Sequence, residues 1–365
     1  MKENQMEKLY VCMTYYHVLI TLIKALTGQE KIDIMISNDI PDVSFLIEKL
    51  RYLSCFDKII ILDEINIQKR RMGKKDLIYY LTDKYIINSK FYEFCKLDFK
   101  KYQDIYLYHD MSSVGKYFLI NHIQYHLIED ALDYFKYFDK YYRIDEGSYK
   151  KGTLKFFLKE KFGIGYKMFG SSEDCIDIEV NELDGVLISK DKCFELPRKQ
   201  LFGLLSEEQK IIVFNAFAAG KEINGTKEKT AIICTQPLYK DSFVNTEEEQ
   251  VLVFRNVIKE YVDSGYKIVI KPHPRDMINY KILAKEFNCD LIDKNLPSEI
   301  LNYNPEAKYD VAVSITSTAI NFLQYAKEKR FMGREYIAEA LGNENHSKEK
   351  GGGISEKLGE KSNLA

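Results

Sequence analysis

A histidine between two prolines is the strongest chemical signal in the chain. The sequence KPHPR at residues 271–275 directly follows the apolar segment 267–270. Proline fixes its own φ and restricts the residue before it, so the imidazole of His273 is held rigidly at the end of a predicted strand. With Lys271 and Arg275 beside it, His273 can bind a phosphate as a hydrogen-bond donor or act as a general acid. A strand-ending turn with an incidental histidine is the competing interpretation, and the two cations favour the phosphate site.

Three further polar loops follow predicted strands in the second half of the chain. They are Thr235-Gln236-Pro237, Pro297-Ser298-Glu299 and 314–319, the last with the sequence SITSTA. Hydroxyl groups and backbone N–H groups at the start of a helix bind anions. Simple helix capping by Ser317 or Thr318 is the alternative, and one segment can do both. Together with the His-Pro loop, these loops predict a nucleotide-phosphate site on one edge of a sheet.

Two acidic pairs in the first half compete for the role of general base. Glu129-Asp130 follows the apolar segment 125–128, and Asp145-Glu146 follows the short segment 142–144. A carboxylate at a strand end can take a proton from a sugar hydroxyl, and a second acid beside it raises its pKa. Either pair can instead complement the dipole at a helix N-terminus. The pattern leaves the choice open.

Motifs for other chemistries are missing from the sequence. There is no Walker-type glycine loop, no G-x-G-x-x-G, no H-E-x-x-H and no D-x-D; Asp104 and Asp110 bracket a strand without forming one. Because a metal-dependent nucleotide-sugar transferase usually needs acidic ligands at a strand end, we expect no required metal and no cofactor.

The elements that must position these residues alternate along the chain. Apolar segments typical of strands are separated by amphipathic helices, which indicates a parallel sheet. The alternation weakens between residues 139 and 184, so we place the domain junction there. We predict an N-terminal domain over 1–165, a C-terminal domain over 166–340 and a tail without chemistry over 341–365. Two Rossmann-like domains facing a central cleft resemble the glycosyltransferase-B type of α/β fold.

The composition excludes several protein classes. The 365 residues hold 53 Lys+Arg and 55 Asp+Glu, a net charge of −2, which argues against a dedicated nucleic-acid binder. The 7 cysteines are scattered without C-x-x-C spacing, which favours a reducing compartment. The first apolar run, 9–23, is short for a membrane span, so we expect a cytoplasmic protein. The basic run 69–75 is read as a solvated loop, with a peripheral contact to anionic lipid as the alternative.

Residues 8–330 together resemble the bacterial sialyltransferases of glycosyltransferase family 52, which act on lipooligosaccharide and capsule. Members carry an acid-acid-Gly motif in the first domain and His-Pro and Ser/Thr-rich motifs in the second. The matching segments here are Glu129-Asp130, His273-Pro274, Thr316-Ser317-Thr318, the opening segment 10–17 and the two loops Thr235-Gln236-Pro237 and Pro297-Ser298-Glu299.

One motif departs from the family pattern. Ala131 stands where members have glycine, and Asp145-Glu146-Gly147 fits the letters better. If the position needs a positive φ, alanine costs about 1 kcal/mol. We favour Asp130 as the base because a clean apolar strand leads into it.

The resemblance implies an inverting transfer of sialic acid from CMP-sialic acid to a terminal galactose of a bacterial surface glycan. Asp130, with Glu129 beside it, would deprotonate the acceptor hydroxyl, and His273 would meet the phosphate. The implied donor-binding residues are Thr235, Gln236, Pro237, Lys271, His273, Pro274, Pro297, Glu299, Thr316, Ser317 and Thr318. The implied partners are a CMP-sugar and a glycan acceptor, lipid-linked acceptors included. The oligomeric state stays open, with a homodimer among the options.

Two other functions remain compatible with the sequence. One is another nucleotide-sugar glycosyltransferase, or a glycerophosphotransferase, on the same fold. The other is an inactive relative that binds a glycan or a nucleotide, with Ala131 as a mark of lost activity.

Overall fold

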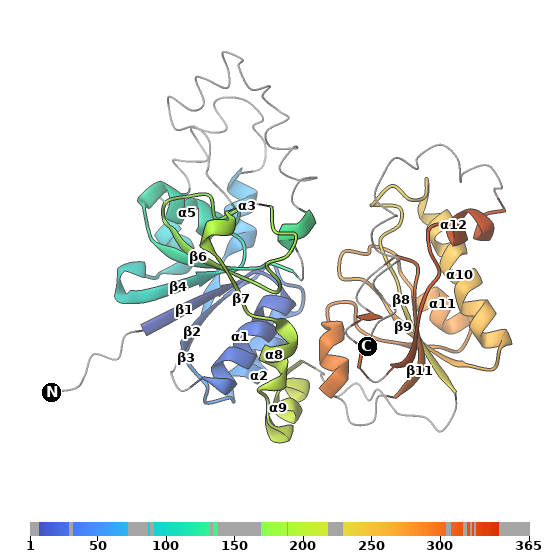
Figure 1. Cartoon of the computed structure of the whole chain (residues 1–365). Helices are drawn as coiled ribbons and strands as arrows, with labels where there is room; N and C mark the ends of the chain where they lie inside the picture. Colours follow the sequence, from blue (N-terminus) through green and yellow to red (C-terminus); the bar gives the residue numbers. More distant parts are fainter. Residues whose placement is uncertain are drawn as a thin grey trace, which may run out of the picture. The chain divides into compact units, whose positions relative to one another are not determined.

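The chain forms two compact units, residues 1–219 and 220–365, each built on its own parallel sheet (Figure 1). The computed structural model describes residues 7–28, 32–71, 87, 91–131, 134–137, 169–187, 189–217, 229–303, 308–316, 320–321, 323–324 and 326–342. Each unit has the parallel α/β plan of a Rossmann-like domain, so the predicted pair of such domains is confirmed.

The N-terminal unit holds a seven-stranded sheet in the order β3-β2-β1-β4-β5-β6-β7, in which every pair is parallel. Its strands are β1 (Glu7–Cys12), β2 (Ile32–Ser37), β3 (Phe56–Leu62), β4 (Tyr102–Leu107), β5 (Tyr125–Ile128), β6 (Cys175–Val180) and β7 (Cys193–Glu195). The order reverses between β1 and β4, which lie side by side although other strands separate them in sequence. In such sheets ligands bind beyond the carboxyl ends of the strands at this switch point.

Helices cover both faces of this sheet (Figure 1). One face carries α1 (Tyr15–Thr27), α2 (Val43–Arg51), α8 (Arg198–Gly203) and α9 (Glu207–Phe217), and the other carries α3 (Glu64–Arg71) and α5 (Ser113–Asn121). Short 3-10 helices are η1 (Phe99–Lys101), η2 (Tyr134–Tyr137) and η3 (Lys190–Lys192).

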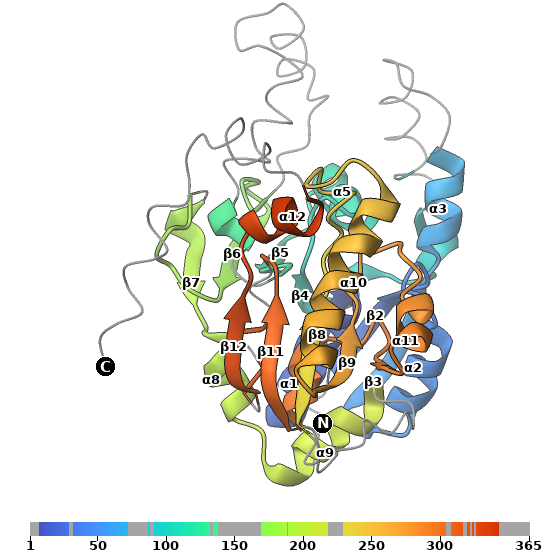
Figure 2. The same cartoon turned by 90° about the vertical axis from the view of Figure 1, so that its right-hand side faces the viewer.

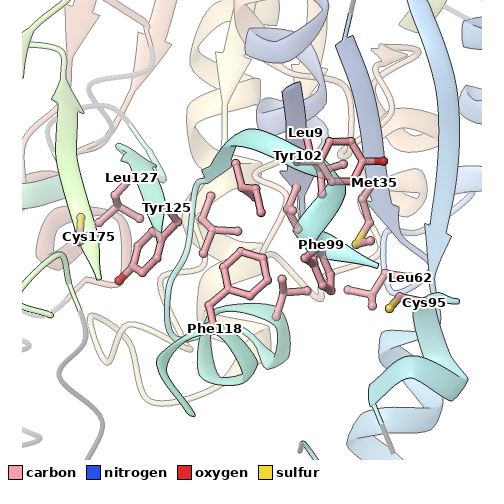
Figure 3. Close-up of a cluster of buried hydrophobic side chains, with 14 of the residues drawn as sticks. Leu9, Met35, Leu62, Cys95, Phe99, Tyr102, Phe118, Tyr125, Leu127 and Cys175 are labelled. Atoms are coloured by element: carbon pink, nitrogen blue, oxygen red, sulfur yellow. The ribbon is translucent and has the colours of Figure 1, made fainter. Parts of the chain in front are cut away.

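The core between the sheet and α5 is apolar and aromatic. Leu9, Phe118 and Tyr125 are among its buried side chains (Figure 3). Gly115 brings α5 close to the loop after β4, because a Cβ there would lie 2.2 Å from the carbonyl oxygen of Asp110. This close packing fixes the loop that leaves the switch point.

The C-terminal unit repeats the plan with five strands in the order β10-β9-β8-β11-β12, all parallel (Figure 2). They are β8 (Thr230–Cys234), β9 (Lys267–Lys271), β10 (Asp290–Leu291), β11 (Tyr309–Ser314) and β12 (Ala326–Phe331). The helices are α10 (Glu247–Asp263), α11 (Lys281–Glu286), α12 (Glu335–Ala340) and the 3-10 helix η4 (Ser298–Tyr303). Its switch point lies between β8 and β11, and α10, α11 and α12 contribute to one core with these strands.

The predicted domain junction at residue 165 is wrong. Strands β6 and β7 pair within the first sheet, and α8 and α9 pack against α1, so the N-terminal unit extends to Ala219. The signal was weak because β6 reads CIDIEV: its buried Glu179 pairs with Lys24 and Arg198, so a charged residue occupies a core position. Strand β12 was missed for a similar reason, because it lies at a sheet edge and five of its six residues are exposed.

The predicted tail without chemistry, 341–365, lies outside the described residues from residue 343 onward.

Candidate functional site

The first candidate edge is the switch point of the N-terminal unit. Thr14, two residues after β1, caps α1, because its Oγ1 accepts a hydrogen bond from the backbone N–H of His17 at 3.2 Å. Ser and Thr are favoured at this position because they satisfy free N–H groups of the first turn. The cap sets the start of α1 and so places His17 in its first turn, beside the carboxyl ends of the central strands.

A His–Asp pair joins this helix to the loop after β5. The Nε2 atom of His17 lies 2.7 Å from Oδ1 of Asp130 and 3.1 Å from its carbonyl oxygen. The backbone N–H of Met13 donates to Nδ1 of His17 at 3.1 Å. Because an N–H can only donate, Nδ1 must be the acceptor, so the neutral ring carries its hydrogen on Nε2 and donates it to Asp130.

The histidine of the His17–Asp130 pair packs against an aromatic ring. The ring of His17 stacks on Tyr108, with centroids 4.4 Å apart and 9° between the planes, and the Tyr108 hydroxyl lies 2.9 Å from Thr21 Oγ1. His17 is fully buried, whereas the Asp130 side chain is 24% exposed. Only the carboxylate end of the pair therefore reaches solvent.

The surroundings of Asp130 favour its ionised form. Burial alone would raise its pKa, but the hydrogen bond from His17 and the nearby His17 and His109 outweigh burial, and the pKa is lowered. Asp130 is thus a carboxylate at neutral pH, as a general base must be.

The neighbouring residues of the acidic motif have other roles. Glu129 is buried, and its carboxylate accepts the backbone N–H of Asn181 at 2.8 Å and that of Phe135 at 3.4 Å. Glu129 therefore ties the loop to β6, and its catalytic role stays a prediction. Ala131 does not adopt a positive φ, so alanine costs no strain there. The competing pair, Asp145 and Glu146, lies outside the described residues.

The second candidate edge, in the C-terminal unit, carries His273 just after β9. Its Nδ1 accepts the backbone N–H of Arg275 at 3.1 Å, so the neutral ring carries its hydrogen on Nε2. Among the described residues, Nε2 has no hydrogen-bond partner. Burial, and then the charges of Arg275 and Lys271, lower the pKa of His273 to about 4. The ring is therefore neutral at neutral pH, with one N–H available to a ligand.

A buried carboxylate holds the His273 loop in place. Asp276 accepts hydrogen bonds from Thr235 Oγ1 at 3.1 Å, from Gln250 Nε2 at 3.0 Å and from the Tyr280 hydroxyl at 2.7 Å. Thr235 Oγ1 in turn accepts the backbone N–H of His273 at 3.3 Å. Sequence reasoning missed Asp276 and Gln250; the acid three residues after the histidine was the one signal that could have found the former.

Gln236 joins the two loops of the switch point. Its Nε2 donates to Ser314 Oγ at 2.7 Å, and its Oε1 accepts the backbone N–H of Thr316 at 3.3 Å. The structure thus brings Gln236 together with Thr316, and Thr235 together with the His273 loop. Ser317 and Thr318 lie outside the described residues.

Among the other predicted donor-binding residues, Lys271 has backbone partners within the protein. Lys271 is buried, and its amine donates to the carbonyl oxygens of Pro272 at 2.7 Å and Lys294 at 3.0 Å; burial lowers its pKa to about 8. It therefore ties the loops after β9 and β10 together. Burial raises the pKa of Glu299, against the charge of Lys271. Pro237 and Pro297 are buried and Pro274 is exposed. The ligand roles of these three prolines, and those of Lys271 and Glu299, stay predictions.

Among the described residues, no group of three or more His, Cys, Asp or Glu side chains could hold a metal ion. Within the same residues, no helix has the length and apolar character needed to cross a membrane.

Several known proteins are similar to this chain. An uncharacterized protein of Haemophilus influenzae is 32% identical over 141 residues, which cover 38% of this chain and 44% of that protein, so the match spans less than half of the relative. An alpha/beta-galactoside alpha-2,3-sialyltransferase of Photobacterium phosphoreum has a TM-score of 0.49 at 13% identity, covering 94% of this chain and 97% of that one. A UDP-GlcNAc 2-epimerase of Methanocaldococcus jannaschii has 0.44 at 11%, covering 92% of each. The sequence profile of Glycosyltransferase family 52 matches residues 61–332, most of both units, and the chain belongs to that family.

Proposed function

We propose that the protein is an inverting sialyltransferase that moves sialic acid from CMP-sialic acid to a terminal galactose of a bacterial surface glycan. Membership in glycosyltransferase family 52 supports a nucleotide-sugar donor and a glycan acceptor. The resemblance of Glu129-Asp130 and His273-Pro274 to motifs of sialyltransferases supports the finer assignment.

The observation that carries the proposal is the open Nε2–H of His273. When the glycosidic bond of the donor breaks, its electron pair passes to the phosphate of CMP, which gains negative charge. A fixed N–H donor at that oxygen stabilises the transition state, because it is oriented before the charge develops. The pKa near 4 applies to the free ring; an anion beside it favours the protonated form, so the proton can follow the growing charge.

Asp130 supplies the other half of the reaction. Its carboxylate takes the proton of the acceptor hydroxyl, and that oxygen forms a bond to the anomeric carbon from the side opposite the departing phosphate. One displacement of this kind inverts the anomeric configuration. The lowered pKa of Asp130 keeps it ready to accept the proton at neutral pH.

The loops of the C-terminal unit are assigned to the donor. In this proposal, Thr316, Ser317 and Thr318 hold phosphate oxygens, and Thr235 and Glu299 frame the ribose and the cytosine. The hydrogen bonds of Gln236 to Ser314 and Thr316 support this assignment, because they fix the loop after β8 to the end of β11 and to the loop that follows it before a ligand arrives.

The test is transfer with defined donors. Purified protein should move sialic acid from CMP-sialic acid to a galactose-terminated acceptor, and CMP and CDP should raise its melting temperature more than UDP and GDP do. Stronger protection by UDP or GDP would indicate another nucleotide-sugar enzyme. Binding of CMP with no transfer to any galactose-terminated acceptor would indicate an inactive relative.

Independence from metal is part of the proposal. Activity should persist in excess EDTA, because donors of the protein meet the phosphate charge. Complete loss of activity in EDTA, with rescue by Mg²⁺ or Mn²⁺, would show that the reaction needs a bound metal ion.

We also propose a cytoplasmic location with a peripheral membrane contact for lipid-linked acceptors. Its basis is the basic run 69–75, which begins in the last turn of α3. Binding to anionic vesicles should fall when Lys69, Arg70 and Arg71 are replaced by glutamine; unchanged binding would contradict this contact.

A further inference from the structure

The two carboxylate oxygens of Asp130 have different surroundings. Oδ1 receives the hydrogen bond from His17 at 2.7 Å, whereas Oδ2 has no hydrogen-bond partner among the described residues. The side chain is 24% exposed, so the carboxylate is fastened at one oxygen and accessible to solvent. One oxygen is thus a fixed point and the other is available to a ligand.

His17 itself is not in a position to act as the base. The ring is fully buried, its Nδ1 accepts the N–H of Met13, and its Nε2 donates to Asp130. A general base must come within hydrogen-bond reach of the proton that it takes, and both ring nitrogens are already in use. The open end of the pair is the carboxylate.

We propose that His17 is a positioning residue for Asp130, which holds Oδ1 so that Oδ2 is presented to the acceptor hydroxyl. This inference rests on the proposed function, because it presumes that Asp130 is the base. Misplacing a catalytic group by about 1 Å costs about 10²-fold in rate. A rigid donor on Oδ1 removes the rotation that would cause such a misplacement.

The pKa of Asp130 should also depend on His17, so the pH profile can be measured besides the rate. His17 and His109 are the titratable groups that lower its pKa, and burial opposes them. Removing the donor of His17 leaves burial and His109, so the pKa of Asp130 rises. The acid limb of kcat/KM reports this ionisation in the free enzyme, and it should therefore move to higher pH.

Two substitutions of His17 separate its two contacts. The amide of asparagine reaches the place of Nδ1, so His17→Asn keeps an acceptor for Met13 and loses the donor to Asp130. The amide nitrogen of glutamine reaches the place of Nε2, so His17→Gln keeps a donor to Asp130 and loses the acceptor for Met13. If His17 has only a structural role, the activities of the two variants should follow their stabilities. If it positions Asp130, the variant that keeps the donor to Asp130 should be the more active one.

The same sheet offers a matched control. His126 lies 2.8 Å from Asp177 and stacks on Tyr106, with centroids 4.7 Å apart. It thus shares an aspartate partner and a tyrosine stack with His17, but it lies within β5 and is not assigned to the reaction. His126 contacts Asp177 through Nδ1, so the matched control is His126→Gln, whose amide reaches the place of Nε2 and loses the contact to the aspartate.

The experiment is the pH profile of sialyl transfer for the full-length variants. We expect His17→Asn to lower kcat by about 10- to 100-fold at neutral pH, with little change in KM for the donor and an acid limb about one pH unit higher. His17→Gln should keep kcat within about tenfold of wild type, and the control His126→Gln should leave the limb in place. An unmoved limb in His17→Asn, or an equal loss in both His17 variants, would overturn the inference.

Asp130→Asn, measured beside these variants, separates failure of the proposed base from failure of the positioning role. Full activity of Asp130→Asn refutes Asp130 as the base. An inactive Asp130→Asn together with an unmoved acid limb in His17→Asn refutes only the positioning role of His17. If His17→Asn does not fold, ¹⁵N spectra of wild-type histidine side chains decide. A hydrogen on Nε2 of His17 supports the inference, and a hydrogen on Nδ1 overturns it.

Discussion

At the carboxyl edge of each sheet a backbone hydrogen bond fixes a histidine ring, but the two rings have different partners. Each sheet reverses its strand order at a switch point, between β1 and β4 or between β8 and β11. Each edge carries a histidine whose Nδ1 accepts a backbone N–H, from Met13 to His17 and from Arg275 to His273. In both cases the main chain fixes the neutral ring with its hydrogen on Nε2.

The difference lies in what the Nε2–H meets. His17 is buried and donates to Asp130, so the N-terminal edge holds a negative charge of its own. His273 has no partner at Nε2 among the described residues, and burial, followed by the charges of Arg275 and Lys271, lowers its pKa to about 4. The C-terminal edge is therefore suited to receive an anion. The same backbone contact to Nδ1 can thus prepare either a base or an anion site, and the residue within reach of Nε2 decides which.

The acidic residues differ in the same way. Asp276 has both oxygens occupied, Oδ1 by Gln250 and the N–H of Ile278, and Oδ2 by Thr235, Gln250 and Tyr280. Asp130 has one oxygen occupied. A carboxylate with every lone pair in use is a structural element, whereas one with an open oxygen can accept a proton.

The largest expected effect is the loss of Asp130. Asp130→Asn should lower kcat by about 10³-fold, because an amide cannot accept the proton of the acceptor hydroxyl. Steady-state transfer from CMP-sialic acid measures this. Asp145→Asn and Glu146→Gln serve as controls and should change kcat by less than about tenfold. The reverse ranking would move the base to the second acidic pair.

The next largest effect is the loss of the phosphate donor. His273→Ala should lower kcat by about 10²-fold, because the transition state loses a fixed N–H beside the growing charge. The fold should persist, since the ring packs at the end of β9 and not within it. Circular dichroism checks the fold, and wild-type turnover by a folded His273→Ala protein would refute the assigned mechanism.

A smaller effect should follow at Asp276, and it should appear first in stability. Asp276→Asn replaces an acceptor by an N–H₂ donor that faces Gln250 and Tyr280, which costs about 1–3 kcal/mol in the free energy of unfolding. Urea unfolding of the full chain measures it. The control is Asp241→Asn, which breaks a partly exposed pair with Arg275 and should cost less than about 1 kcal/mol. Equal costs would show that the buried cluster does not anchor the His273 loop.

Much of the fold was predictable because strand signals are local. Apolar runs such as 125–128 and 231–235 led directly into polar residues, so both edges and the residues Asp130 and His273 could be named from the sequence. Strands β6 and β12 escaped because buried ion pairs or an exposed edge position replaced their apolar pattern.

The partners within each site were not predictable, because their contacts are distant in sequence. His17 and Asp130 are 113 positions apart, and Gln250 reaches Asp276 across 26. His17 and Gln250 each resemble an ordinary residue of an amphipathic helix. Only the fold, by placing α1 beside the loop after β5 and α10 beside β9, reveals that these two side chains hold a functional loop.

The most direct test of the division between the two edges is the affinity of CMP, measured by calorimetry on folded wild type, Asp130→Asn and His273→Ala. We predict that Asp130→Asn binds CMP within about twofold of wild type, and that His273→Ala binds it at least about tenfold more weakly, the scale of one hydrogen bond to a charged group. Weaker binding in Asp130→Asn together with unchanged binding in His273→Ala would show that the nucleotide does not bind at the C-terminal edge.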